Sequence, residues 1–555
     1  MNAKIDLVWL GDSPPPLWTL GAIHTVAAEP IHIAELIRSK LADSSADVWL
    51  FWHSRLGTPD AEVMARVIQL PGNVWHAGLR LGLAGLPGII DFIVGTWTLN
   101  RDPDEMIEAT SWRLSLEACL ITTDVLRQMG GPRPEFTTLV AASLELGHRY
   151  ITRGVITRHI PWMLPEKISK QFTTLPFIDE VRFAYYRFGK GHTYWALLRA
   201  ILSGYASLIT AWKSWQAVRG SARPKQTIYK HPALAGDSPP MQSAKVSVLI
   251  PTVDRYPYLR KLLEQLRTQT VKPHEIIVVD QTQAARRDLT LGADYKDLPL
   301  KIINQDEPGQ CTSRNAGLQA STGDFILFID DDDEVSNDLL ELHLKNLARF
   351  KVQVSSGAAD EIGAGPLPEN FTFIRVSDVF PTNNTMIYRE VLRASGMFDL
   401  AYNRRQRADG DLGTRIYLSG TLMILNPEIR VLHHHAPSGG LRVHKARVVT
   451  YASSRQHLFI RHLPAVSEIY LTRRYFTDRQ VYENLWLRAF GTYSIRGGLG
   501  RKLLKALAST LLLPNTVWKI RQRRNEAEEL LKTFPQIPAL DAQEQVQSVG
   551  VGGKS

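Results

Sequence analysis

The sequence predicts an α/β protein built around a largely parallel sheet. Two short apolar runs, 246–250 and 275–279, flank a segment at 259–269 whose leucines recur at helical spacing. A strand, a helix and a strand within about 35 residues form a βαβ unit, which implies parallel strands and a right-handed crossover. A third apolar run, 325–329, leads directly into four aspartates. These carboxylates therefore stand where a buried strand leaves the core, the edge at which open α/β sheets bind ligands.

Length and composition set outer bounds on the organisation. A chain of 555 residues is too long for one core and implies two to four folding units. Its apolar content of 44% with 22% charged residues is ordinary for a globular protein. The two cysteines, Cys119 and Cys311, lie far apart without histidines at metal-binding spacing. A disulfide framework and a zinc module are therefore excluded, and a reducing compartment fits.

The amino-terminal sequence and the net charge indicate where the protein acts and what it binds. The first residues show no basic segment followed by an apolar one, so no secretory signal is expected. The most apolar stretch, 78–97, is interrupted by Arg80, Pro87 and Asp91, which argues against a membrane-spanning helix. The net charge of +10 favours anionic partners, among them nucleic acid, nucleotide-sugar phosphates and an acidic membrane.

Residues 221–244 are polar and rich in Pro and Gly, which predicts a linker between two domains. A new domain opens at Lys245 with the strand 246–250, which Pro251 ends. The strand 275–279 ends at Asp280. Another strand is expected at 301–304 and a helix at 311–320, before the strand that delivers the aspartates. Carboxylates thus end two successive core strands.

Four of these motifs, taken together and in this order, resemble a known family. They are 248–252 (VLIPT), 275–280 (EIIVVD), 313–317 (SRNAG) and 323–333 (GDFILFIDDDD), and they look like the nucleotide-sugar-binding half of a family 2 glycosyltransferase of the GT-A fold. Residues 408–415 (ADGDLGTR) resemble the acidic motif of the acceptor half, which usually reads Glu-Asp-x-Asp-Leu. Ala408 replaces the usual glutamate, so one supporting carboxylate is missing. The resemblance covers about 245–440.

The resemblance implies a metal-dependent, inverting transfer of a sugar from a nucleoside diphosphate sugar to an acceptor hydroxyl. It makes Asp409 the catalytic base and Asp332 a direct ligand of Mg or Mn. One of His433 and His435 would complete the metal site, and Arg314 would lie near the diphosphate. Asp280 would read the nucleobase. The residues expected to bind the donor are Pro251, Thr252, Asp254, Asp280, Arg314, Asp330 and Asp331.

General chemistry supports these roles. A departing diphosphate develops negative charge that a divalent cation can neutralise, and an acceptor hydroxyl needs a positioned base at neutral pH. Each residue also has a plain alternative. The acidic run could be a solvated turn, Asp280 a loop cap, Arg314 a surface ion-pair partner and Asp409 one member of a local ion-pair cluster. The histidines 433–435 could be structural.

The first 220 residues carry a second, weaker copy of the pattern. Residues 47–52 parallel 324–329, but His53, Ser54 and Arg55 follow where the other copy has Asp330, Asp331 and Asp332. Ser143 stands in the place of Asp409. One offset relates Asp124, Gly130, Arg149 and Gly154 to Glu390, Gly396, Arg415 and Gly420. We expect a tandem duplication in which the first copy lost its carboxylates; chance similarity of short apolar segments is the alternative.

The remaining chain is expected to be helical at 446–535, with a polar, disordered tail at 536–555. Residues 501–507 and 519–524 combine leucines with positive charge, which is typical of a basic amphipathic helix at an anionic membrane; packing on the catalytic domain is the alternative. The predicted domains are therefore a degenerate GT-A-like unit (1–220), the linker (221–244), a catalytic GT-A unit (245–445), the helical extension and the tail.

The predicted function is glycosyl transfer in polysaccharide or glycoconjugate synthesis, with a glycan or lipid-linked acceptor and no nucleic acid partner. A cytoplasmic location, peripheral on the inner face of the membrane, suits such an acceptor. One alternative is a non-catalytic scaffold that binds a sugar or nucleotide. A nucleotidyltransferase is another, but residues 252–255 (TVDR) lack the glycine- and lysine-rich loop that it needs.

Overall fold

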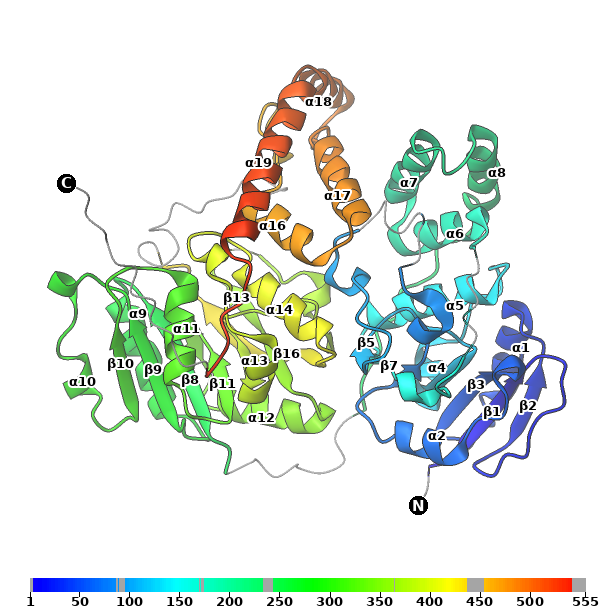
Figure 1. The fold of residues 1–555 in the computed structure, drawn as a ribbon, viewed down its shortest axis with the longest axis horizontal. Coiled ribbons are helices and arrows are strands. Elements are labelled where there is room, and N and C mark those ends of the chain that lie inside the picture. The colour runs from blue at the N-terminus through cyan, green and yellow to red at the C-terminus, as the bar shows by residue number, and fades with distance from the viewer. Residues whose placement is uncertain are drawn as a thin grey trace.

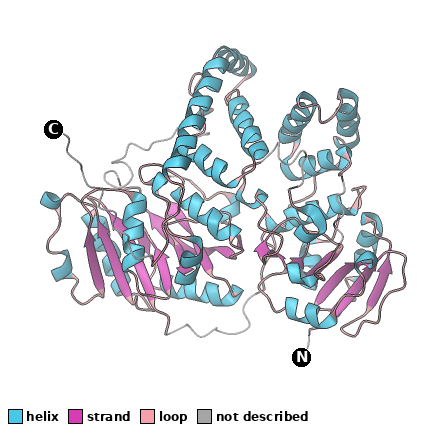
Figure 2. Cartoon of the chain, viewed as in Figure 1, coloured by secondary structure: helices cyan, strands magenta, loops and turns pink. Residues whose placement is uncertain are grey.

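The computed structural model describes residues 3–85, 88, 95–168, 170, 174–232, 243–363, 365–436 and 454–541. Two separate mixed sheets, each flanked by helices, form two units, and two groups of helices project from them on one side (Figures 1 and 2). The predicted α/β class is confirmed. Part of the expected linker, 233–242, and most of the expected tail, 542–555, lie outside the described residues.

The second unit contains the predicted βαβ unit. Strands β10, β9, β8 and β11 are parallel, and β15 pairs with β11 in the opposite direction. The sheet order is β10-β9-β8-β11-β15-β13-β16-β12, with β14 also paired to β16. Its strands are β8 (Val246–Thr252), β9 (Glu275–Asp280), β10 (Leu300–Asn304), β11 (Phe325–Phe328), β12 (Asp333–Val335), β13 (Val354–Glu361), β14 (Arg375–Val376), β15 (Thr385–Tyr388) and β16 (Met423–His433).

Helices cover this sheet because their apolar faces match its buried side chains. In α9 (Tyr256–Arg267) the leucines Leu259, Leu262, Leu263 and Leu266 are buried at helical spacing, as predicted. The predicted helix at 311–320 is also confirmed, as α11. The other helices of the unit are α10 (Leu291–Asp294), α11 (Gln310–Ala320), α12 (Leu339–Phe350), α13 (Arg389–Ser395) and α14 (Ala408–Leu418).

The first unit has its own sheet, in the order β2-β1-β3-β6-β4-β7-β5. Large aromatic side chains, among them Trp49, Trp52 and Phe51, fill its core. Its strands are β1 (Ile5–Leu10), β2 (Ile23–Val26), β3 (Val48–His53), β4 (Val74–His76), β5 (Ala109–Thr110), β6 (Ala118–Thr122) and β7 (Thr157–His159). Its helices include α1 (Pro30–Lys40), α2 (Ala61–Val67), α4 (Thr123–Met129) and α5 (Leu139–Ile151).

The two sheets share one topology. If β1, β2, β3, β4, β5, β6 and β7 are laid on β8, β9, β11, β13, β14, β15 and β16, the neighbours and the strand directions agree at every pairing of the first sheet. A buried arginine repeats as well. Arg149 Nη2 donates to the Gly131 carbonyl oxygen at 2.7 Å, and Arg415 Nη2 donates to the Met397 carbonyl oxygen at 2.7 Å. Their carboxylate partners are Glu145 and Asp411, each four residues earlier.

Two helical arms extend the units. One consists of α6 (Phe177–Phe188), α7 (Lys190–Leu202) and α8 (Leu208–Val218). The other consists of α16 (Val466–Tyr475), α17 (Asp478–Gly491), α18 (Leu499–Leu511) and α19 (Leu513–Thr533). None of the helices that the structure describes is both long and apolar enough to cross a membrane.

After α19 the chain returns to the second unit as an extended strap, 534–541. The Met397 N–H donates to the Pro538 carbonyl oxygen at 2.8 Å, and Leu540 is buried. Asp541 accepts hydrogen bonds from Arg389 and Arg393. Residues 536–541 were expected to belong to a disordered tail, and they pack instead, because Leu540 and Asp541 meet a matching apolar and basic surface.

Candidate active site

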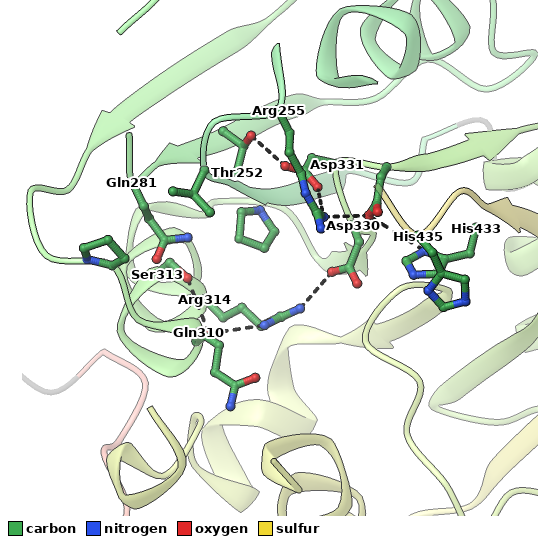
Figure 3. Close-up of a pocket in the computed structure, with 14 residues that line it drawn as sticks. Thr252, Arg255, Gln281, Gln310, Ser313, Arg314, Asp330, Asp331, His433 and His435 are labelled. Carbon is green, nitrogen blue, oxygen red and sulfur yellow. Dashed lines mark hydrogen bonds and ion pairs between the residues drawn. The ribbon is translucent and has the colours of Figure 1, made fainter. Parts of the chain in front are cut away.

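A cavity of about 230 Å³ opens at the carboxyl ends of β8 and β11 (Figure 3). The start of α11 forms one wall and the end of β16 another. Its lining residues come from five separate stretches of the second unit: Pro251, Thr252, Val253, Arg255, Gln281, Pro308, Gln310, Ser313, Arg314, Asp330, Asp331, Asp332, His433 and His435. The predicted ligand-binding edge of the sheet thus coincides with a real cavity.

The acidic run is not a solvated turn. Asp331, Asp332 and Asp333 are 3%, 1% and 3% exposed, and only Asp330 is half-buried. The backbone closes tightly after β11, since the Asp330 N–H donates to Asp333 Oδ2 at 3.0 Å. Three adjacent carboxylates are therefore held out of water, which is costly unless cations or hydrogen-bond donors meet them.

Arg255, at the start of α9, supplies the nearest cation. Its Nη1 lies 3.0 Å from Asp331 Oδ1 and 3.0 Å from Asp332 Oδ1. Thr252, the last residue of β8, donates its hydroxyl to Asp331 Oδ2 at 2.7 Å. Burial nevertheless dominates, and it raises the pKa of Asp331 to about 7 although Arg255 and Thr252 oppose it. This cluster links β8, α9 and the acidic turn.

Asp332 retains one oxygen without a hydrogen bond. Its Oδ2 accepts the Ala436 N–H at 2.8 Å, whereas Oδ1, though buried, accepts none. Oδ1 lies 3.8 Å from His433 Nδ1. A carboxylate oxygen beside an imidazole suits a divalent cation. No group of three or more His, Cys, Asp or Glu side chains with metal-binding geometry occurs among the described residues. The described side chains therefore do not form a complete metal site by themselves, and Arg255 is the cation nearest to Asp332 Oδ1.

The three histidines separate although β16 ends at His433, and His435 has a positive φ of 52°. His433 and His435 line the cavity with ring centroids 4.4 Å apart, whereas His434 pairs with Glu334. His433 Nδ1 lies 2.8 Å from Asp333 Oδ1. Burial lowers the pKa of His433, but the bond to Asp333 and the nearby carboxylates outweigh burial and raise it to about 9. His433 is thus positively charged at neutral pH in the absence of a cation.

Arg314 points into the cavity from α11 (Figure 3). Its Nη2 donates to Asp330 Oδ1 at 2.8 Å, and its side chain is about 10% exposed. A surface role is excluded, because its carboxylate partner is itself a cavity residue. Arg255 and Arg314 place two guanidinium groups on opposite sides of the acidic turn, a suitable arrangement for a diphosphate.

Two predicted donor-binding residues lie beside the cavity rather than in its lining. Asp280 is buried and accepts hydrogen bonds from the Tyr256 hydroxyl at 2.6 Å and the Thr282 N–H at 2.9 Å. Asp254, at a positive φ of 56°, pairs with Arg286. The neighbour of Asp280, Gln281, lines the cavity in its place and accepts the Gly309 N–H at 2.7 Å.

The predicted base, Asp409, also lies outside the cavity lining. It is exposed in the first turn of α14 and makes no hydrogen bond or ion pair with any residue that the structure describes. Asp411, two residues on, is buried and bonded to Arg415 and Tyr475. Burial raises the pKa of Asp411. The motif therefore has one free and one structural carboxylate.

Several cavity residues escaped the sequence analysis, namely Val253, Arg255, Gln281, Pro308, Gln310 and Ser313. Position alone offered a signal for two of them, because Val253 and Gln281 directly follow Thr252 and Asp280, which were expected to bind the donor. Gln310 is fixed by long-range contacts, since its Nε2 donates to the Tyr402 carbonyl oxygen at 2.6 Å. That contact also ties the cavity wall to the loop before α14.

Known proteins match part of the chain. Residues 247–396 match the model of the family Glycosyl transferase family 2. The uncharacterized glycosyltransferase YwdF of Bacillus subtilis is 40% identical over 90 residues, which are 16% of this chain and 33% of that protein. Glycosyltransferase GlyA of Streptococcus pneumoniae is 31% identical over 114 residues, which are 20% of this chain and 16% of that protein. The chain thus spans a third or less of these relatives.

Solved structures show more distant similarity. S. aureus TarS is 16% identical with a TM-score of 0.33, over 51% of this chain and 55% of that one. The mannosyltransferase PcManGT of Pyrobaculum calidifontis is 19% identical with a TM-score of 0.35, over 65% of this chain and 99% of that one. The family assignment depends on the sequence match, which covers β8 to α13 and the acidic turn. Within residues 247–396, the chain is thus similar to glycosyl transferase family 2.

Proposed function

We propose that the second unit transfers a sugar from a nucleoside diphosphate sugar to an acceptor hydroxyl, with inversion at the anomeric carbon. The observation that carries this proposal is the cavity in which Asp330, Asp331 and Asp332 meet Arg255 and Arg314 at the ends of parallel strands. A scaffold without catalysis has no use for three adjacent buried carboxylates, because charges held out of water destabilise the fold.

The donor would bind with its diphosphate between the two arginines. Arg314 forms its ion pair with half-buried Asp330, and its hydrogen bonds to Gln310 and Thr382 are long, at 3.3 and 3.4 Å, so it can turn toward a phosphate at little cost. Backbone at Pro251 to Val253 and the amide of Gln281 line the side of the cavity nearest β8 and β9, which suits the nucleoside. We therefore assign base recognition to Gln281 together with Asp280, the residue predicted from the motif.

A divalent cation, Mg or Mn, would be held by Asp332 Oδ1, with His433 or His435 and the donor phosphates completing its ligands. When bound, it would neutralise charge on the departing diphosphate. The chain's own residues prepare this place. Arg255 keeps Asp331 and Asp332 together, and Ala436 orients Asp332 through Oδ2. His433 must give up a proton before it can act as a ligand.

Asp409 would take the proton from the acceptor hydroxyl as that oxygen attacks the anomeric carbon. The bond to the diphosphate oxygen then breaks, and the diphosphate leaves with its electrons. Two facts support this role. Asp409 is exposed without a described partner, whereas Asp411 is fully engaged with Arg415 and Tyr475. The loop before α14 is also bonded to the cavity wall through Gln310.

We propose that the first unit is a duplicated copy that does not catalyse sugar transfer. The shared strand order and the repeated arginine contacts support the duplication. At the end of β3, Arg55 pairs with Glu117 where the second unit has Asp332. A cation replaces a carboxylate at that point and occupies the nearby carboxylate of Glu117, which disfavours a metal-assisted reaction there. The copy would instead bind the acceptor or a partner, or buttress the catalytic unit.

We propose that the acceptor is a glycan or a lipid-linked sugar and that the reaction belongs to polysaccharide or glycoconjugate synthesis. The protein would be cytoplasmic and peripheral on the inner face of the membrane. The support lies in α18, whose leucines point to solvent. A helix that exposes leucines beside basic residues is suited to the surface of an anionic bilayer.

Thermal-shift measurements test the donor proposal. Mn with UDP, GDP, ADP or dTDP is added in turn, and one diphosphate is expected to raise the melting temperature of the wild-type protein. The same diphosphate should fail to stabilise Asp332→Asn. Release of nucleoside diphosphate from the matching sugar donor should require Mn and disappear in Asp409→Asn, which should still bind the diphosphate. Release without metal, or an active Asp409→Asn, would refute the mechanism.

A further inference from the structure

Helix α18 buries polar side chains and exposes apolar ones. Its buried residues are Lys505 and Ser509, which are 1% and 2% exposed. Lys505 donates to three backbone carbonyl oxygens, those of His457, Leu458 and Ile460. The leucines on the other face are 56 to 74% exposed: Leu499, Leu503, Leu504, Leu507 and Leu511. A helix that buries a lysine and exposes five leucines presents an apolar surface, which is typical of a site that binds a partner or a membrane.

The first unit has a similar surface at the junction of α7 and α8. The residues where α7 ends and α8 begins are 46 to 70% exposed: Leu198, Leu202, Leu208, Ile209 and Trp212. The buried residues of α8 are Ala211, Ser214 and Val218, which are smaller than the exposed ones. The hairpin therefore keeps its large apolar side chains outside, at the junction of its two helices.

Both surfaces lie within segments that contain no acidic residue. Residues 190–219 hold four lysines and arginines, and residues 484–525 hold nine, with no aspartate or glutamate in either. These thirteen positive charges exceed the net charge of the whole chain, which is +10. The basic character of the protein is thus concentrated where its apolar surfaces are, and the rest of the chain is slightly acidic.

The two arms are joined to each other. Arg199 of α7 donates to both carboxylate oxygens of Glu483 in α17, at 2.9 and 2.6 Å, and both side chains are nearly buried. The rings of Trp195 and Phe490 meet at 5.4 Å. Figure 1 shows α7 with α8 and α17 with α18 rising on the same side of the molecule, away from both sheets. Their tips therefore face one common direction.

We propose that the α7–α8 hairpin is a second membrane-binding element, which acts with α18 to seat the protein on the surface of an anionic phospholipid bilayer. This rests on the proposed peripheral contact of the C-terminal helices and adds the first unit to it. The leucines and Trp212 would enter the interfacial region, and the flanking lysines and arginines would meet lipid phosphates. Two joined contacts fix the orientation of the donor cavity relative to the bilayer, which one helix alone cannot do.

Flotation of the full-length protein tests the proposal. The vesicles contain phosphatidylcholine with about 30 mol % phosphatidylglycerol, or phosphatidylcholine alone, at low salt. One variant carries Leu208→Glu with Ile209→Glu, and another Leu503→Glu with Leu507→Glu. The matched control carries Leu17→Glu with Leu289→Glu, since both leucines are 89% exposed and lie outside the arms. Circular dichroism and melting temperature verify the folding of each.

The wild-type protein and the control should float with anionic vesicles. Each arm variant should lose at least about fivefold in bound fraction, which corresponds to about 1 kcal/mol. If the Leu208→Glu, Ile209→Glu variant floats like the wild type while the α18 variant does not, the hairpin is not a lipid contact and only the C-terminal helices bind. Failure of the wild type to float overturns both membrane proposals, and donor turnover, measured separately, remains a test of the chemistry alone. Equal flotation with phosphatidylcholine alone would contradict the argument from charge.

Discussion

Gly154 and Gly420 occupy equivalent positions in the two units, and each packs against the other unit in the same way. A Cβ on Gly154 would lie 2.8 Å from the carbonyl oxygen of Ile374, and a Cβ on Gly420 would overlap the carbonyl oxygen of Glu108. Glu108 and Ile374 each directly precede the short strand at the edge of their own sheet, β5 or β14. The contact is therefore reciprocal, as in a two-fold symmetric dimer.

Substitution Gly420→Ala is expected to weaken this contact. The residue has a φ of 85°, which costs an alanine about 1 kcal/mol, and the new methyl group would meet backbone that cannot move aside. We expect a loss of about 2 kcal/mol or more in unfolding free energy, measured by urea denaturation. Gly57→Ala is the control, because Gly57 has a φ of 76° and nothing within 4 Å of its Cβ position. Equal losses in the two variants would show that backbone strain alone is responsible.

Asp332→Asn should separate activity from stability. It removes one of two buried carboxylates that share Arg255, and Arg255 keeps its ion pair with Asp331, so the melting temperature should change little. Donor turnover should fall at least about a hundredfold, because the cation loses its carboxylate ligand. Steady-state kinetics with Mn checks this, with Asp306→Asn as a control, since Asp306 is 86% exposed at the surface. A turnover rate within threefold of the wild type (about 0.7 kcal/mol) would exclude Asp332 from the metal site.

The buried histidines make stability depend on pH. Burial lowers the pKa of His343 to about 4, although a hydrogen bond to Asn384 opposes this. The unfolded chain therefore binds a proton near pH 6.5 that the folded chain refuses until about pH 4. The contribution of His343 to the unfolding free energy should be constant above pH 6.5. It should fall by about 3 kcal/mol as the pH is lowered from 6.5 to 4. Urea denaturation at several pH values should show a shallower fall for His343→Gln, and an unchanged slope would contradict the assignment.

Asp541 should stabilise the second unit from the far end of the chain. It accepts hydrogen bonds at 2.6 Å from Arg389, which is nearly buried, and from Arg393. Asp541→Asn is expected to lower the unfolding free energy by about 1 kcal/mol. Glu529→Gln in α19, which removes an ion pair between two largely exposed side chains, should have almost no effect. Calorimetry compares the two, and similar melting temperatures would mean that the strap adds no stability.

The sequence predicted the parts of the fold that depend on local pattern. Apolar runs ending in carboxylates located β9 and β11, and parallel pairing then placed the acidic turn at the cavity. It did not predict Arg255 as a site residue, because the sequence does not show which carboxylate this arginine pairs with. Only the fold brings the start of α9 next to Asp331, 76 residues away. The strap was missed for a related reason. Its short sequence, which contains two prolines, carries no helical or strand periodicity, and contacts with α13 and Met397 give it a fixed place.

The reciprocal glycine contact has a consequence for how the molecule works in dilute conditions. A symmetric dimer of single units would separate as its concentration fell, whereas two units on one chain keep a constant, high effective concentration for each other. The second unit is therefore never without the first, and the ratio between them cannot vary. Any task that the first unit performs is delivered in fixed stoichiometry with each active centre, whatever the expression level of the protein.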